Sequence, residues 1–299
     1  MYLITGAGGG VGSVSRRVVQ LLVDDGEQVR AMVRRDDERA DQLRALGAEV
    51  VVGDLTHAGD IVDAMDGASR MFFNMSVSAD YLLATAEVCA VALERGRLDA
   101  IVNMSQMTVS QMTLTSTGES QHQRLHWLAE HVFYWSGLPV IVVRPTAFLD
   151  NPLFTVLAAP TIRDRGVLVL PFGTGRTSPI AAADVARVVA ALLRDPADHM
   201  GNVYELTGPE VLDIDGLADQ YTRGLGRPVV GEDVPYDKWE REVLAPIGLP
   251  EHVAQHIATM ARLHREDRYN RATDDVEQIT GQRAQTVEQY VASNPDLFY

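Results

Sequence analysis

The hydrophobic residues in the first half of the chain come in short runs that alternate with segments of helical periodicity. Apolar runs at 2–5, 28–34, 49–52, 71–75, 100–104 and 140–143 predict six strands. Between them, the apolar spacing predicts helices over about 12–23, 38–46, 61–65, 79–94 and 119–136. Strands that alternate with helices form right-handed βαβ units, so we expect an α/β fold with a doubly wound, Rossmann-type parallel sheet.

After residue 145 the pattern is less regular. Runs at 167–170, 178–180 and 202–206 have the composition of strands, and 184–194 predicts an amphipathic helix with Asp184 as its N-cap. From about residue 214 the chain is mostly helical in pattern. We therefore expect a Rossmann core at 1–155, completed by about 178–206. Residues 156–177 and 207–299 would form a smaller, mostly helical cap on the substrate side, over the carboxyl ends of the strands.

Composition narrows the class of protein. Of the 299 residues, 46% are hydrophobic and 22% are charged, as in globular rather than disordered chains. The net charge of −15 repels phosphate backbones, so nucleic acid is not an expected partner. Cys89 is the single cysteine, which excludes an intramolecular disulfide. No apolar run is long enough for a membrane span and the first residues form no basic leader, so we expect a soluble, cytoplasmic protein.

A glycine-rich loop joins the first strand to the first helix. Its glycines have the spacing G-x-x-G-x-x-G within TGAGGGVG at 5–12. Glycine permits positive φ angles and lets the backbone approach a pyrophosphate closely, while the following helix offers its free N–H groups to the phosphates. The strand–loop–helix context predicts a dinucleotide site. The residues expected to form it are Thr5, Gly6, Gly9, Gly10, Val11 and Gly12.

The end of the second strand bears on which dinucleotide binds. NAD-binding proteins usually carry an acidic residue there, whereas this chain has Arg34 followed by Arg35. Two guanidinium groups favour the 2′-phosphate of NADP(H). Asp36 and Asp37 come next, and either could accept a hydrogen bond from the 2′-hydroxyl of NAD(H). We expect NADP(H), with NAD(H) as the alternative.

Residues that follow the later strands complete the expected cofactor site. An acidic residue after the third strand can accept a hydrogen bond from the adenine amino group or cap the next helix. Polar and backbone groups after the fourth strand lie beside the expected position of the second ribose. These residues are Asp54 and Leu55 after the third strand, Asn74, Met75 and Ser76 after the fourth, and Pro145 and Phe148 after the sixth.

The sequence resembles the atypical short-chain dehydrogenases/reductases, and within them the NmrA-like NAD(P)-binding family. The resemblance is carried by TGAGGGVG at 5–12, VRAMVRR at 29–35, GAEVVVGDL at 47–55, HWLAE at 126–130, SGLPVIVVRPTAFLDN at 136–151, DVA at 184–186, YELTGP at 204–209 and ITG at 279–281. It covers nearly the whole chain. The family includes small-molecule reductases, quinone oxidoreductases and non-catalytic redox-sensing regulators. The resemblance therefore implies the fold and the cofactor well, and the reaction poorly.

The resemblance also locates the expected catalytic positions. Short-chain dehydrogenases use a Tyr-x-x-x-Lys pair and an upstream serine, and in this family the lysine lies four residues before a helix glutamate, here Glu130. His126 stands at the lysine position and His122 at the tyrosine position, while Ser105 occupies the place of the serine. The one lysine of the chain, Lys238, lies in no such motif, so the pair is absent.

Several roles are open for these residues. His122 and His126 share one helix face, so His126 could hydrogen-bond the cofactor ribose and His122 could donate a proton, or both could be packed or exposed histidines. Ser105 could orient a substrate carbonyl or cap the strand end. His252 and His256 also lie four residues apart, but without a third ligand they do not predict a metal site.

We expect an NAD(P)H-dependent reductase of a small, flat, apolar electrophile, because quinones and enones accept hydride with little help from a protein acid. Two alternatives remain: a non-catalytic NADP(H)-binding redox sensor with a protein partner, and a pathway enzyme that binds the cofactor with no net redox change. A set of apolar and aromatic residues favours a flat substrate, or packs in the core. They are Met107, Met112, Phe148, Phe154, Tyr236 and Trp239.

Overall fold

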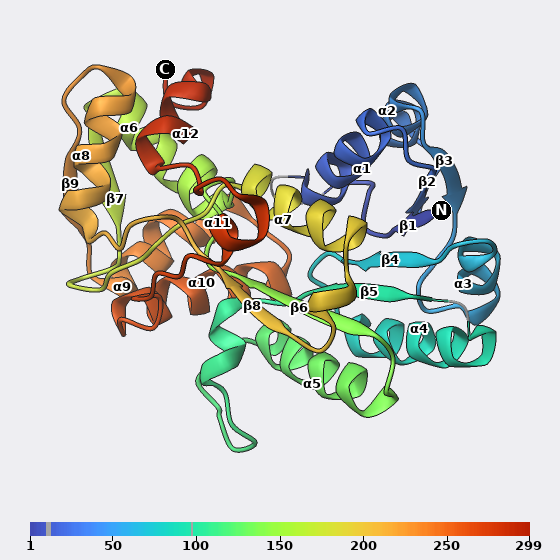
Figure 1. The fold of residues 1–299 in the computed structure, drawn as a ribbon. Helices are drawn as coiled ribbons and strands as arrows, with labels where there is room; N and C mark the ends of the chain where they lie inside the picture. Colours follow the sequence, from blue (N-terminus) through green and yellow to red (C-terminus); the bar gives the residue numbers. More distant parts are fainter. Residues whose placement is uncertain (10–12, 97) are drawn as a thin grey trace. The chain divides into compact units, whose positions relative to one another are not determined.

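A seven-stranded sheet forms the framework of the computed structural model, which describes residues 1–9, 13–96 and 98–299 (Figure 1). The strands are β1 (Tyr2–Ile4), β2 (Val29–Val33), β3 (Glu49–Val52), β4 (Arg70–Phe73), β5 (Ala100–Met104), β6 (Val140–Pro145) and β8 (Val203–Leu206). Their order is β3-β2-β1-β4-β5-β6-β8, and the pairs from β3 to β6 are all parallel. The predicted Rossmann-type sheet is confirmed.

Helices cover both faces of this sheet. The helices between its first six strands are α1 (Val14–Asp24), α2 (Glu38–Leu46), α3 (Ala58–Met65), α4 (Tyr81–Arg95) and α5 (Gln121–Ser136). Figure 1 shows α1 and α2 on one face and α3, α4 and α5 on the other, as expected for a doubly wound sheet. Because both faces are covered, every residue of β1 and β5 is buried, whereas β3 at the sheet edge is half exposed.

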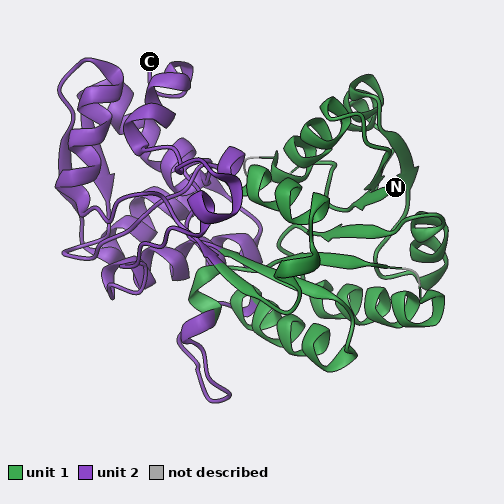
Figure 2. Cartoon of the chain, in the orientation of Figure 1, with its two compact units in different colours: residues 1–109, 122–144, 185–204 green, residues 110–121, 145–184, 205–299 purple. Residues whose placement is uncertain are grey.

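The chain divides into two compact units (Figure 2). Unit 1 comprises residues 1–109, 122–144 and 185–204, and unit 2 comprises residues 110–121, 145–184 and 205–299. Unit 2 contains a two-stranded parallel sheet of β7 (Val167–Leu170) and β9 (Val230–Asp233). Its other elements are mainly helices, which confirms the predicted helical C-terminal region. The remaining α-helices are α6 (Ala159–Arg165), α7 (Ala182–Arg194), α8 (Ile214–Leu225), α9 (Tyr236–Trp239), α10 (Glu251–Arg265), α11 (Asp275–Thr280) and α12 (Val287–Ser293).

A buried histidine organises the core of unit 2. The ring of His264 stacks between Phe172, with ring centroids 4.2 Å apart, and Tyr269, with centroids 3.8 Å apart. Its Nδ1 lies 2.7 Å from the carbonyl oxygen of Met260, so this nitrogen carries the proton, and Nε2 lies 3.2 Å from the Thr177 hydroxyl. Burial lowers the pKa of His264 to about 3, so the ring is neutral at physiological pH.

Two strands differ from the sequence expectation. The run at 178–180 was expected to form a strand, but within the described chain Ile180 makes only an isolated bridge with Phe148. Conversely, β9 has the sequence Val-Gly-Glu-Asp, which lacks the apolar run typical of a parallel strand. It forms because β7 offers a partner, with Val167 opposite Val230.

The predicted N-cap of α7 is wrong. The helix begins at Ala182, before Asp184, and the Ala182 N–H donates to the Asp150 carboxylate at 2.9 Å. The Asp184 carboxylate instead accepts from the backbone N–H of Gln285 at 2.7 Å. Asp150, which is distant in the sequence, therefore accepts the hydrogen bond from the first N–H of this helix. Asp184, within the helix, holds the loop that contains Gln285. No helix of the described ranges is both long and apolar enough to cross a membrane.

Candidate functional site

The glycine loop closes tightly on the end of β4. The Thr5 hydroxyl lies 2.8 Å from the Asn74 carbonyl oxygen, to which it donates, and accepts from the Asn74 N–H at 3.0 Å. Gly6 has a φ of +66°, and a Cβ built on it would lie 2.7 Å from the same carbonyl oxygen. Gly9 has a φ of +132°, which side chains other than glycine rarely allow. Both positions therefore require glycine for the backbone to turn as it does.

The start of α1 continues this loop. Gly10, Val11 and Gly12, which the motif predicts at the phosphates, lie outside the described residues. Ser13 follows with a φ of +51°, and in the described part of the chain its side chain makes no capping hydrogen bond. The first N–H groups of a helix have no partner within the helix, so an uncapped start suits an anion. The loop and the helix start together fit the pyrophosphate of a dinucleotide.

Two predicted cofactor residues, Arg34 and Asp54, form an ion pair. Arg34 Nη2 lies 2.6 Å from Asp54 Oδ2, and the Arg34 side chain is 66% exposed. Thr56 donates to the other oxygen from its N–H at 3.0 Å and its hydroxyl at 2.8 Å. Burial raises the pKa of Asp54, but the hydrogen bonds from Thr56 and Arg34 outweigh it and lower the pKa to about 2. Arg35 is exposed and has no ion pair among the described residues.

Asp36 and Asp37, the residues that would favour NAD(H), are also engaged. Asp36 Oδ1 lies 2.7 Å from Arg44 Nη2. Asp37 is the N-cap of α2 and accepts from the N–H of Arg39 at 3.0 Å, while its carboxylate also binds the Arg39 guanidinium. Arg39 was not among the residues predicted from the sequence. Helical periodicity places it in the first turn of α2 but gives no sign of which loop its side chain meets.

The predicted cofactor residues after β3 and β4 differ in how far their side chains are exposed. Asn74 Nδ2 donates to Ser15 Oγ of α1 at 2.9 Å, so this side chain ties the end of β4 to α1. Leu55 is buried, and Met75 is half-buried against the core of unit 1. Ser76 is exposed. Of these four predicted residues, only Ser76 presents an exposed side chain.

His122 and His126 lie on one face of α5, as their spacing predicts, and both are buried. Their Nε2 atoms lie 3.0 Å apart, so one ring donates its N–H and the other accepts. Tyr81, at the start of α4, contacts both rings, with centroids 4.2 Å from His126 and 5.8 Å from His122. The Tyr81 hydroxyl donates to the Met104 carbonyl oxygen at 2.9 Å, and burial raises its pKa far above the usual range. No sequence pattern indicates Tyr81 as a neighbour of these histidines, because it precedes them by some forty positions.

A second polar group joins β5, α5 and β6. The Ser105 hydroxyl donates to Glu130 Oε1, and Arg144 binds both Glu130 oxygens, with Nε 3.0 Å from Oε1 and Nη2 2.5 Å from Oε2. The Glu130 and Arg144 side chains are only 10% and 18% exposed. This bonding favours the structural role of Ser105 at the strand end over orientation of a substrate carbonyl. It also gives a physical reason for the glutamate and the arginine in the family-like segments.

Pro145 and Phe148, predicted at the cofactor, belong to unit 2. Pro145 is buried, and Phe148 is half-buried in its bridge with Ile180. The residues expected to favour a flat substrate are mostly inaccessible, which supports core packing as their role. Buried among them are Met107, Met112, Phe154 and Trp239, whereas Tyr236 is half-buried.

The two histidines of the second pair differ in exposure, since His252 is exposed and His256 is half-buried. His252 is exposed, whereas His256 Nδ1 lies 2.8 Å from Ser120 Oγ, and burial lowers the pKa of His256 to about 4. Across residues 1–9, 13–96 and 98–299, no three His, Cys, Asp or Glu side chains are grouped so that they could hold a metal ion.

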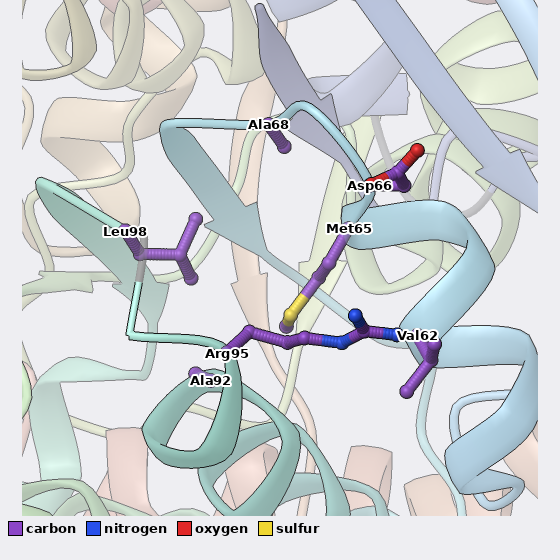
Figure 3. A pocket seen from close by; sticks show the side chains of 7 residues that line it. All are labelled: Val62, Met65, Asp66, Ala68, Ala92, Arg95 and Leu98. Atoms are coloured by element: carbon purple, nitrogen blue, oxygen red, sulfur yellow. The ribbon is translucent and has the colours of Figure 1, made fainter.

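A small pocket in unit 1 lies elsewhere on the sheet (Figure 3). It is formed where α3 and α4 end and where the chain enters β4 and β5, which is the amino edge of these strands. Ligands of open α/β sheets bind at the carboxyl edge, so this pocket is not the candidate site. Its lining residues are Val62, Met65, Asp66, Ala68, Ala92, Arg95 and Leu98.

Comparison with known proteins agrees with this geometry. The chain is 26% identical to an NAD(P)H azoreductase of Xenophilus azovorans over 292 residues, which cover 97% of each protein. It is 29% identical to a (4-alkanoyl-5-oxo-2,5-dihydrofuran-3-yl)methyl phosphate reductase of Streptomyces griseus over 298 residues, covering 100% of this chain and 99% of the relative. The fold is shared with an NADPH-dependent quinone oxidoreductase of Escherichia coli complexed with NADPH, at a TM-score of 0.83 and 22% identity, covering 98% of this chain and 99% of that one. The NAD(P)H-binding family matches residues 9–196, and with a glycine loop built in this way at the head of a Rossmann-type sheet, the chain belongs to that family.

Proposed function

We propose that the protein is an NADP(H)-preferring reductase of small, flat, electron-poor acceptors such as quinones, enones and azo compounds. The observation that carries the proposal is the hydrogen-bonded pair of His122 and His126 at the positions where the family-like pattern expects a tyrosine and a lysine. Such a pair suits a reaction in which the acceptor needs little acid catalysis.

The chain supplies the cofactor site from the first part of unit 1. Thr5 fixes the loop, Gly6 and Gly9 give it its turn, and the start of α1 offers N–H groups to the phosphates. Gly10, Val11 and Gly12 would complete the cradle. Bound NAD(P)H supplies the hydride. Arg34 and Arg35, both exposed guanidinium groups, favour the form that carries a 2′-phosphate.

The histidine pair supports cofactor seating rather than acid catalysis by a permanent cation. Because the two Nε2 atoms share one proton, at least one ring is neutral in this arrangement. A lysine would hold a steady positive charge beside the ribose, which a neutral imidazole cannot do. We infer that His126 donates a hydrogen bond to the cofactor ribose and that His122 orients the His126 ring through the hydrogen bond between their Nε2 atoms.

The two sequence relatives support the choice of acceptor. One is named for azo compounds and the other for a 5-oxo-2,5-dihydrofuran, which is an unsaturated carbonyl compound. Both acceptors contain an electron-poor double bond that takes up hydride directly, and the remaining proton can come from water. An alcohol dehydrogenase, by contrast, must deprotonate a hydroxyl and needs a strong positioned base.

To test the proposal, the protein is mixed with NADPH and, in turn, with each member of a panel of quinones, enones and azo dyes. We expect the NADPH absorbance to fall with at least one acceptor class and the reduced acceptor to form in equal amount. Tight NADPH binding without turnover on any acceptor would instead support the redox-sensor alternative. Conversion of a substrate without net oxidation of NADPH would support the pathway enzyme with no net redox change.

A further inference from the structure

The segment that precedes α5 is attached closely to the C-terminal part of unit 2. Each of residues 118–121 makes a hydrogen bond or an ion pair to α10 or to the turn that follows it, and all of these contacts lie within unit 2. The partners of residues 118–121, in order, are Arg262, Arg268, His256 and Gln255. The segment comes after β5 along the chain, and ligands of open α/β sheets bind beyond the carboxyl ends of the strands. Its polar side chains are therefore candidates for contact with a ligand.

Glu119 in this segment has a buried carboxylate that is only half satisfied. Its side chain is 4% exposed, and its Oε1 lies 3.2 Å from Arg268 Nη2. Oε2 is buried as well, but no residue in the described ranges donates a hydrogen bond to it. A buried carboxylate oxygen without a donor destabilises the fold. A ligand that donates an N–H or O–H to Oε2 would remove this cost.

Arg268, the partner of Glu119, is held in one orientation and keeps a free donor. Its Nε donates to Gln111 Oε1, and Gln111 Nε2 donates to the Arg268 carbonyl oxygen at 2.8 Å. Because Nε and Nη2 are both bonded, the plane of the guanidinium group is fixed. Nη1 donates to none of the residues that the structure describes, and the Arg268 side chain is 29% exposed. A small molecule can therefore reach the ion pair from the side of the guanidinium group.

The ion pair has the polarity to bind an uncharged ligand. It presents one acceptor, Glu119 Oε2, and one donor, Arg268 Nη1. The two charges balance, and Gln111 adds none, so a charged ligand would leave a net charge in a largely buried place. A neutral molecule with an N–H or O–H next to a carbonyl oxygen matches both atoms. Quinones and enones already carry the carbonyl oxygen.

We infer that Glu119 and Arg268 bind the polar end of the acceptor, and that they select uncharged quinones or enones with an N–H or O–H beside the carbonyl group. The inference rests on the proposed function. Arg268 donates to the carbonyl oxygen, and Glu119 accepts from the neighbouring N–H or O–H. An acceptor without that hydrogen leaves Oε2 unpaired, which is the basis of the selection. The two residues determine specificity and take no part in hydride transfer.

Three naphthoquinones that differ only at position 2 test the selection. In 2-amino-1,4-naphthoquinone the substituent donates a hydrogen bond, in the 2-methyl compound it does neither, and in the 2-methoxy compound it only accepts. Calorimetry with the full chain and excess NADP⁺, which cannot reduce them, measures the affinity for each. The test variant is Glu119→Gln. Since Arg268 requires an oxygen opposite Nη2, the new amide nitrogen replaces Oε2 and the acceptor becomes a donor. Thermal unfolding followed by circular dichroism checks that each variant is folded.

We expect the wild-type protein to bind the amino compound about tenfold more tightly than the methyl compound, because a hydrogen bond to a carboxylate is gained. In Glu119→Gln the order should reverse, with the methoxy compound bound about threefold more tightly than the amino compound. Glu232→Gln is the matched control. It makes the same change in an exposed ion pair with Arg165 in unit 2 and should leave the wild-type ratio unchanged within about twofold.

Several results would overturn the inference. Equal wild-type affinities for the amino and methyl compounds, or no binding of any of the three, would show that the ion pair does not select the acceptor. A preference for the amino compound that persists in Glu119→Gln would show that Glu119 is not the acceptor of the hydrogen bond. The same change of ratio in Glu232→Gln would assign the effect to overall charge.

Oxidation of NADPH separates this inference from the proposed function. Wild-type protein that oxidises NADPH with the methyl compound, but has no preference for the amino compound, would refute the inference alone. A clear preference in binding without oxidation of NADPH by any acceptor would refute the proposed function and leave the binding site in place.

Discussion

Two regions at the carboxyl edge of the unit 1 sheet hold their polar groups in different ways. The first region comprises the glycine loop after β1 and the charges after β2, which are largely exposed and are matched in separate ion pairs, such as Arg34 with Asp54. After β5 and β6 the polar groups are buried in short hydrogen-bonded chains, such as Glu130 with Arg144. Exposed pairs contribute little stability and can release a partner, whereas breaking a buried pair is costly. The first region is therefore suited to exchange its partners for ligand atoms, and the second is suited to keep its shape.

In the first region, the largest expected effect comes from adding a side chain at Gly9 of the glycine loop. Gly9→Asp places a side chain at a φ of +132° and a carboxylate beside the expected phosphates. We expect NADPH affinity to fall about a hundredfold or more, and the unfolding temperature to fall by a few degrees because the side chain strains the backbone at this φ. Calorimetry measures the affinity, and Gly9→Ala separates the effect of the backbone from that of the charge. Normal NADPH binding by the aspartate variant would refute the assignment of the loop.

The second region is tested by removing its charge. Glu130→Gln leaves the Arg144 guanidinium, which is 18% exposed, without its carboxylate. We expect the free energy of unfolding to fall by about 3 kcal/mol, near the lower end for a buried pair because some exposure remains. Urea denaturation measures the change. The control Arg163→Ala breaks an exposed pair and should cost no more than about 0.5 kcal/mol, so similar losses in both variants would remove the distinction between the regions.

The variant Arg34→Ala tests whether Arg34 leaves its ion pair with Asp54 and binds the cofactor instead. We expect NADPH binding to weaken about tenfold and NADH binding to change less than about twofold, because one charge-assisted hydrogen bond is lost with the 2′-phosphate. Parallel titrations with the two dinucleotides measure this selectivity. Equal losses would instead indicate that Asp36 or Asp37 binds the ribose of NAD(H).

The smallest expected effect concerns the buried histidines. In His126→Ala the proposed hydrogen bond to the ribose is lost, which should weaken NADPH binding about twofold to tenfold. The single-turnover rate with a quinone acceptor should fall by a similar factor, since the acceptor needs no protein acid. Affinity and rate are measured separately on the same variant. A rate loss of about a thousandfold at unchanged affinity would show that His126 is the catalytic acid, and no change in either would make it a packing residue.

The local sequence pattern was sufficient to predict most of the glycine loop in the first region. A strand followed by closely spaced glycines and a helix has few stable arrangements, and Gly6 and Gly9 adopt the positive φ angles that such a turn needs. Counting residues alone shows that no Tyr-x-x-x-Lys pair exists in a chain with one lysine. The spacing of His122 and His126 likewise fixes their common helix face.

The sequence by itself thus determined the sheet, most of its helices and the residues that line the glycine loop, because apolar periodicity and backbone freedom are local properties. It could not determine which side chains meet across the fold. Ser105 bonds to a glutamate 25 positions away, the first N–H of α7 bonds to Asp150, and Arg39 reaches back to Gly9. Only the tertiary structure decided these pairs, since each depends on how strands and helices distant along the chain pack together, and packing direction leaves no trace in composition or spacing.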